Sequence, residues 1–377
     1  MFDSPEVCRR PVGAGIYAGK ADVERKRQLY HQMLLSMKVF SLLSVLAPVF
    51  FPATTVSAQT IVDGNGTIPD DLNGSNFTYP WPIKLYKFTS QRQPLEMAFM
   101  DVRPQSAPNG KVAALFHGKN FCAATWEGTA RTLVSAGFRV IIPDQIGFCK
   151  SSKPERYQFT LQQFALNTYG LLQALSIENV TVIGHSMGGM LATRYSLMYP
   201  GSVNELALVN PIGLEDWKAL GVPYQSIDVS WGQEANSSYE SVRAYQQSTY
   251  YVGQWVPKYD VWVKMLVDIY KGSQSAPFIF NQAQTTDMVL TQPIVYEFGL
   301  LKPRTLLING KKDTTAIGKQ WSPPDVAAKL GHYDVLGKGT VAKIPNGTLI
   351  EFDDLGHAPQ IQDSERFYAA LMGWLTK

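Results

Sequence analysis

One serine lies between a short apolar run and a helix-like segment, and this arrangement constrains the fold more than any other feature. The run Val180–Ile183 has the length of a buried strand, and Met190–Met198 has the pattern of a helix. The turn between them, residues 184–189, reads Gly-His-Ser-Met-Gly-Gly. Its glycines permit a turn so sharp that Ser186 must adopt a strained backbone, and the following helix directs positive potential towards it. The segment predicts a strand, a sharp turn and a helix, with Ser186 as a candidate nucleophile.

Strand-like and helix-like segments alternate along most of the chain. The strand-like runs are Leu85–Phe88, Leu95–Val102, Val112–Phe116, Val140–Pro143, Val180–Ile183, Leu206–Val209, Thr305–Ile308 and Thr348–Phe352. The helix-like segments are Thr125–Ala136, Leu161–Leu175, Met190–Met198 and Ser364–Leu375, the last with Ser364 as its predicted N-cap. Such alternation predicts a doubly wound α/β sheet, which binds ligands at the carboxyl ends of its strands.

The segment 214–299 interrupts this alternation, since it contains no strand-like run. We expect a helical cap there, inserted between the sixth and seventh strands, with 80–213 and 300–377 as the core. Its four tryptophans and eight tyrosines either pack in the interior or line a substrate cavity.

A nucleophilic serine needs a base, and the base needs a carboxylate to orient it. His357 lies on a loop after the last strand, whereas His332, the alternative, follows no strand. Asp313 follows the strand before that one, and Asp216 is the rival acid. We therefore predict that Ser186, His357 and Asp313 act together.

The negative charge that develops during attack on a carbonyl needs hydrogen-bond donors. The strand Val112–Phe116 leads into His117, Gly118 and Lys119. We expect the backbone amides of Lys119 and Met187 to form this oxyanion hole, and His117 to brace the loop.

The first 58 residues have the pattern of an export signal. Lys38 precedes the apolar stretch 39–51, and Val56-Ser57-Ala58 places small residues before a cleavage site after Ala58. An apolar stretch of thirteen residues is short for a helix that spans the bilayer, so a retained anchor is the weaker interpretation. We expect a periplasmic or secreted protein, whose translation starts at Met33 or Met37.

Removal of residues 1–58 also removes the basic charge. That segment holds seven of the 34 Lys and Arg residues and four of the 31 Asp and Glu residues, which leaves 27 of each sign. A neutral mature chain indicates no nucleic-acid partner. No CxxC pair or Cys/His spacing predicts a metal site.

Five segments together resemble the α/β-hydrolase superfamily, in the branch with a serine nucleophile, a His-Gly oxyanion loop and a helical cap. They are His117-Gly118, Pro143-Asp144-Gln145-Ile146-Gly147, the turn from Gly184 through Ser186 to Gly188 and Gly189, Gly310-Lys311-Lys312-Asp313 and Gly356-His357. The resemblance covers 80–377 and implies a mostly parallel eight-stranded sheet flanked by helices, with no cofactor. Lys119-Asn120-Phe121 departs from the family's usual proline-containing turn.

The resemblance also places Cys122 and Cys149 on two loops that border the same pocket. Cys149 stands where the family often has glycine. In an oxidising compartment the two cysteines can pair, so the resemblance suggests the hypothesis of a disulfide between them and leaves open whether they are bonded.

The implied activity is hydrolysis of an ester, lactone, thioester or amide through an acyl-enzyme. A C–C bond hydrolase, a cofactor-free perhydrolase and a binding or receptor protein on the same fold remain alternatives. The aromatic residues and low charge of the cap predict a small-molecule acyl substrate of apolar or aromatic character.

Overall fold

A computed structural model describes residues 24–25, 27–29, 31, 59–63, 71–105 and 107–377. The apolar stretch 39–51 of the predicted export signal and its cleavage site after Ala58 lie outside these residues. Among the helices that the structure does describe, none is both long and apolar enough to cross a membrane.

The described residues form one nine-stranded sheet in the order β1-β2-β3-β5-β4-β6-β7-β8-β9. Strands β4 to β9 are all parallel, and β1, β2 and β3 join them as an antiparallel edge. Their bounds are Thr60–Val62, Ile83–Ser90, Gln93–Val102, Val112–Phe116, Arg139–Pro143, Val180–His185, Val203–Val209, Arg304–Gly310 and Gly347–Phe352 for β1 to β9. The mostly parallel α/β sheet is therefore confirmed.

The prediction of eight strands was one short. The extra strand, β1, has three residues and pairs with β2 at the outer edge of the sheet. Two of its side chains are exposed, so it lacks the buried apolar run that makes a strand visible in a sequence. The turn between β2 and β3 is tight. Gln91 and Arg92 form it alone, with φ of 48° and 65°, as two-residue hairpin turns require.

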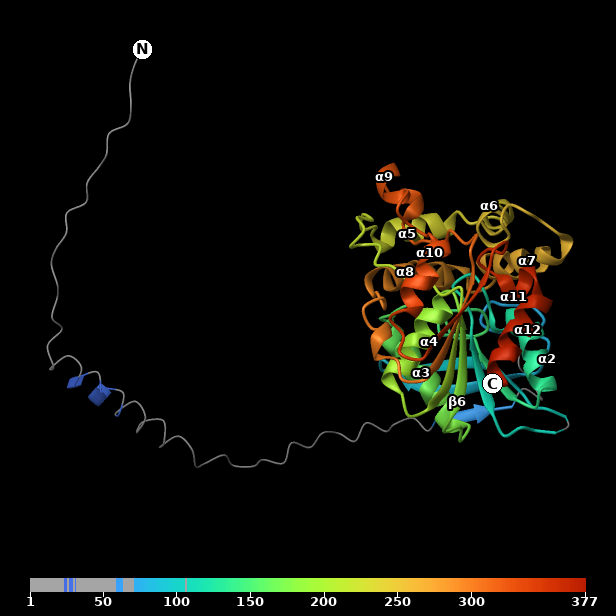
Figure 1. Ribbon diagram of the computed structural model, residues 1–377, viewed down its shortest axis with the longest axis horizontal. Coiled ribbons are helices and arrows are strands. Elements are labelled where there is room, and N and C mark those ends of the chain that lie inside the picture. Colours follow the sequence, from blue (N-terminus) through green and yellow to red (C-terminus); the bar gives the residue numbers. More distant parts are fainter. Residues whose placement is uncertain (1–23, 26, 30, 32–58, 64–70, 106) are drawn as a thin grey trace, which may run out of the picture. The chain divides into compact units, whose positions relative to one another are not determined.

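Helices cover both faces of the sheet. α3 (Leu161–Ala174) and α4 (Met187–Met198) contact each other on one face, and α2 (Glu127–Ser135) contacts α12 (Ser364–Leu375) on the other (Figure 1). Alternate residues of β4 belong to the two separate apolar clusters that result. α12 has its predicted bounds, but its N-cap is Asp363, whose carboxylate accepts from the Arg366 amide, and not Ser364.

The segment between β7 and β8, the sixth and seventh of the predicted strands, contains helices and no strand within residues 214–299, and we refer to it as the cap. They are α5 (Ile227–Ala235), α6 (Tyr239–Tyr245), the π-helical turn η2 (Gln246–Tyr250), α7 (Asp260–Tyr270) and α8 (Ser275–Thr291). Figure 1 shows α5, α6 and α7 gathered at one end of the sheet. Short helices α9 (Pro324–Ala327), α10 (Tyr333–Val341) and α11 (Pro359–Gln362) complete the C-terminal part.

Candidate active site

Ser186 occupies the sharp turn between β6 and α4 in a strained conformation, with φ of 57° and ψ of −122°. The turn packs so tightly that its glycines have no room for side chains. A Cβ atom on Gly184 would lie 2.1 Å from the carbonyl oxygen of Gly188, and one on Gly188 would lie 2.2 Å from that of Phe116. This crowding explains why glycines flank the serine. Because Ser186 directly follows β6, it lies at the carboxyl end of the parallel strands.

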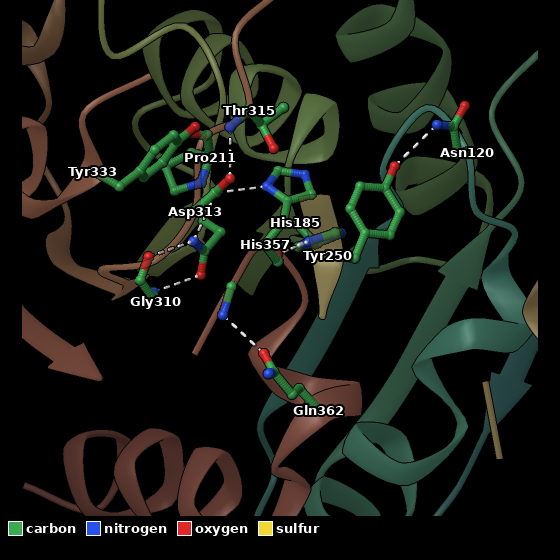
Figure 2. A network of polar contacts seen from close by, with 12 residues as sticks. Asn120, His185, Pro211, Tyr250, Gly310, Asp313, Thr315, Tyr333, His357 and Gln362 are labelled. Atoms are coloured by element: carbon green, nitrogen blue, oxygen red, sulfur yellow. Dashed lines mark hydrogen bonds and ion pairs between the residues drawn. The ribbon is translucent and has the colours of Figure 1, made fainter. Parts of the chain in front are cut away.

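His357 and Asp313 form a buried pair. Nδ1 of His357 lies 2.6 Å from Oδ2 of Asp313, and both side chains are at most 1% exposed (Figure 2). The carboxylate accepts two further hydrogen bonds, from Nδ2 of Asn210 at 2.9 Å and from the amide of Thr315 at 2.8 Å. These donors hold the carboxylate in one orientation towards the imidazole.

The contact with Asp313 defines the protonation of the imidazole. A carboxylate only accepts, so Nδ1 of neutral His357 carries the proton and Nε2 is free to take one. No hydrogen bond joins Ser186 Oγ to Nε2 among the described residues. Such bonds often form only when substrate binds, so the geometry suits a general base.

His185 has a role that the sequence did not reveal. Although His185 is adjacent to Ser186 in the chain, its Nε2 lies 2.8 Å from the carbonyl oxygen of His357. Burial and the neighbouring His357 hold the pKa of His185 well below its usual value. The ring is therefore neutral, donates from Nε2, and fixes the backbone of the base. Its partner lies 172 positions away, so no local pattern could have indicated this.

Asn210 is a second residue that sequence reasoning missed. It follows β7 directly, with a φ of 37°. Its Oδ1 accepts from the amide of Gly310 at 3.0 Å, while its Nδ2 donates to Asp313. Asn210 thus fixes the loop that carries the acid. The sequence did offer one indication of this role, because Asn210 is a polar residue at the carboxyl end of β7, the strand that pairs with β8.

His117 braces the loop after β4, as expected. Its Nε2 accepts from the amide of Gln145 at 3.0 Å, so Nδ1 carries the proton and donates to the carbonyl of Gly118 at 2.9 Å. Burial lowers the pKa of His117, which keeps this arrangement neutral. The same carbonyl accepts from the amide of Phe121 at 3.1 Å.

Two backbone amides near Ser186 remain available. In a trans peptide the N–H points away from the preceding carbonyl, so the Lys119 amide points away from His117. Neither this amide nor that of Met187 donates to another group in the part of the chain that is described. A Cβ atom on Gly118 would lie 3.0 Å from Cβ of Ser186, so the loop contacts the nucleophile. These amides suit the predicted oxyanion hole.

A disulfide joins Cys122 to Cys149, the predicted pair, with Cα atoms 5.8 Å apart. It ties the loop after β4, which carries the predicted oxyanion donor, to the loop after β5. These cysteines and Asp144 are the one group of possible metal ligands among the described residues. The disulfide occupies both sulfurs, and Asp144 accepts from Tyr79 and from the amide of Ala123, so the group suits no metal ion.

The rival residues lie elsewhere. His332 is exposed, and its Nε2 lies 2.8 Å from the carbonyl of Ala328. Asp216 accepts from the hydroxyl of Tyr296 and from the amide of Lys218. Neither residue contacts His357 or Asp313.

Two cavities lie between the core and the cap. One, of about 380 Å³, is lined by Lys119, Asn120, Glu234, Tyr245 and Tyr270 among others. The other, of about 270 Å³, is lined by Tyr245, Thr249, Thr315 and Lys319 among others. Nζ of Lys119 lies 2.6 Å from Oε1 of Glu234 in the first cavity, whose walls thus combine aromatic and charged groups.

Comparison with known proteins agrees with this geometry. Residues 114–251 match the family described as alpha/beta hydrolase fold. The crystal structure of a probable hydrolytic enzyme from Pseudomonas aeruginosa PAO1 is 54% identical, with a TM-score of 0.78, and the match covers 79% of this chain and 95% of that one.

Two curated relatives match over shorter segments. An uncharacterized protein of Mycobacterium tuberculosis is 33% identical over 129 residues, which are 34% of this chain and 37% of that protein. A 2-hydroxy-6-oxo-6-phenylhexa-2,4-dienoate hydrolase of Comamonas testosteroni is 31% identical over 140 residues, which are 36% of this chain and 49% of that protein. The matched segment thus spans less than half the length of either relative.

Proposed function

The chain belongs to the α/β-hydrolase family of hydrolytic enzymes, and on this premise we propose that it cleaves an ester, lactone, thioester or amide through an acyl-enzyme on Ser186. The observation that carries the proposal is the buried contact of 2.6 Å between His357 and Asp313, since an oriented neutral imidazole is what a serine nucleophile needs. The hydrogen bond from His185, the neighbour of Ser186, to the backbone of His357 further supports it.

The proposed reaction uses only side chains and backbone amides of this chain. His357 Nε2 takes the proton of Ser186 Oγ as the oxygen attacks the carbonyl carbon. The amides of Lys119 and Met187 stabilise the resulting oxyanion. His357 then gives its proton to the leaving group, and a water molecule activated by the same imidazole releases the acid.

A substrate panel tests the bond type. We would measure turnover of p-nitrophenyl esters of increasing chain length, of lactones and of aminoacyl amides by the purified mature protein. Turnover of at least one class, with none by Ser186→Ala, is expected. Equal turnover by the wild type and Ser186→Ala would contradict the proposal.

A C–C bond hydrolase is the second candidate, because the relative from Comamonas testosteroni is named as a dienoate hydrolase. The same triad could serve such a reaction. Loss of the dienoate absorbance, measured at equal enzyme concentration beside the esters, separates the two. Faster turnover of the dienoate would favour the second candidate.

We also propose that the protein is exported. The basic residue Lys38, the apolar stretch 39–51 and the small residues before Gln59 support this, and the disulfide suits an oxidising compartment. N-terminal sequencing of the native protein should find Gln59 first. A mature end well upstream of Gln59 would contradict the proposal.

A further inference from the structure

A tyrosine of the cap reaches the proposed general base. Tyr250 ends the π-helical turn η2, and its ring centroid lies 5.0 Å from that of His357, with the planes at 33° (Figure 2). π-helical turns are frequent at functional sites. The backbone of Tyr250 also packs against Gly356, the residue before His357, because a Cβ atom on Gly356 would lie 2.6 Å from the carbonyl oxygen of Tyr250. Tyr250 is only 4% exposed, so its ring shields this side of the imidazole from water.

The hydroxyl of the same tyrosine contacts the oxyanion loop. Nδ2 of Asn120 donates to the Tyr250 hydroxyl at 2.9 Å, and Asn120 directly follows Lys119, which carries the proposed donor amide (Figure 2). The ring of Phe121 lies 5.5 Å from that of Tyr250. One cap side chain therefore contacts the base with its ring and the oxyanion loop with its hydroxyl.

A second contact links the cap to the same loop. Glu234 of α5 accepts from the ammonium group of Lys119 and from the hydroxyl of Tyr270. This contact holds the Lys119 side chain, so loss of the Tyr250 hydroxyl should displace the loop only slightly. The ring of Tyr250 packs against the imidazole of His357 together with the ring of His185, whose centroid lies 4.9 Å from that of His357.

We propose that Tyr250 is a positioning residue that aligns His357 and the Lys119 amide with each other. The inference rests on the proposed serine-hydrolase mechanism. If Tyr250 has this role, the cap contributes to the rate of acylation as well as to the choice of substrate. Removal of the hydroxyl should loosen the oxyanion loop, and removal of the ring should also release the imidazole and admit water to it.

The test compares Tyr250→Phe and Tyr250→Leu with a matched cap variant. Tyr239→Phe removes a hydroxyl that donates to Asp260 within the cap at 2.9 Å. The readout is the rate at which a fluorophosphonate labels Ser186, together with kcat and KM for a p-nitrophenyl ester. We expect Tyr250→Phe to lower the labelling rate and kcat by about three- to tenfold, the range of one hydrogen bond, with KM unchanged. Tyr250→Leu should lower both further, and Tyr239→Phe should leave both unchanged.

Asn120→Ala supplies a readout that a purely structural role would not change. If its bond to Tyr250 carries the effect, Asn120→Ala should slow labelling in the wild type but not in Tyr250→Phe. The unfolding midpoint of each variant shows that it is folded. Labelling of Tyr250→Phe at the wild-type rate, or additive effects of the two substitutions, would overturn the inference. A folded wild type that resists labelling would instead overturn the proposed function, and the inference with it.

Discussion

Nδ1 of His357 lies 2.6 Å from Oδ2 of Asp313, and the two residues come from loops after neighbouring parallel strands, β9 and β8. The same carboxylate oxygen accepts from Asn210, which follows β7. Three adjacent strand ends therefore build the acid and base half of the site. The arrangement assigns the proton of neutral His357 to Nδ1 and leaves Nε2 able to accept a proton.

Replacement of Asp313 tests this assignment. The amide of Asp313→Asn offers the imidazole a donor or a weaker acceptor and no charge, so the ring loses both its orientation and the stabilisation of its cation. We expect kcat to fall by about 10³- to 10⁴-fold, with KM within a few-fold of the wild type. Asp216→Asn is the matched control and should retain activity. A fall of less than tenfold in Asp313→Asn would assign the orienting role to another residue.

The contact between the oxyanion loop and the nucleophile predicts the effect of Gly118→Ala. The added methyl would lie 3.0 Å from Cβ of Ser186 and 3.1 Å from Nδ1 of His185, so the loop must shift. We expect kcat to fall by about 10²- to 10³-fold, as when one oxyanion donor is lost. Gly201→Ala, which meets nothing within 4 Å, should leave kcat unchanged. Wild-type kcat in Gly118→Ala would exclude this loop from the oxyanion hole.

The disulfide should stabilise the fold by limiting the unfolded chain. Cys122 and Cys149 are 27 residues apart, and closure of a loop of that length contributes about 3.5 kcal/mol. The double variant Cys122→Ala, Cys149→Ala should lose about this much free energy of unfolding in urea. In the unreduced wild type neither thiol should react with iodoacetamide. Alkylation of both without reductant would show that the bond is absent.

Two buried neutral histidines predict acid instability. The pKa of His117 and that of His185 are lower in the folded chain than in the unfolded chain, where each is about 6.5. Below that pH the unfolded chain binds protons that the folded chain does not, so stability is lost as the pH falls. The slope approaches about 1.4 kcal/mol per pH unit for each histidine.

The free energy of unfolding measured between pH 7 and pH 5 checks this slope. His117→Gln should remove about half of the histidine contribution. An identical slope in the wild type and His117→Gln would contradict the neutral, buried assignment of His117.

Some of this architecture follows from local patterns. Buried parallel strands such as β4 and β6 appear as short apolar runs, so their ends, and the residues after them, could be located from the sequence. Ser186, Asp313 and His357 each follow such a run. The order of the strands in the sheet then brings their ends together.

Other features depend on contacts between distant segments and leave no local pattern. The roles of His185 and Asn210 arise only when β6, β7 and β8 lie side by side. Strand β1 is too short and too exposed to produce an apolar run. Tyr250 is one of eight cap tyrosines, and its contacts with His357, Asn120 and Gly356 distinguish it only in the folded chain. The aromatic cap predicts an apolar or aromatic substrate, and this stays a prediction.

The most direct test of the central claim is covalent labelling of the mature wild-type protein by a fluorophosphonate, followed by mass spectrometry of the peptides. We predict one equivalent of label, located on Ser186, and none on Ser186→Ala. Ser196→Ala is the matched control, because Ser196 lies on α4, the helix that follows Ser186, is buried, and donates to the carbonyl of Ala192. It should be labelled like the wild type. A folded wild-type protein that takes no label, or takes it on another residue, would contradict a nucleophilic Ser186.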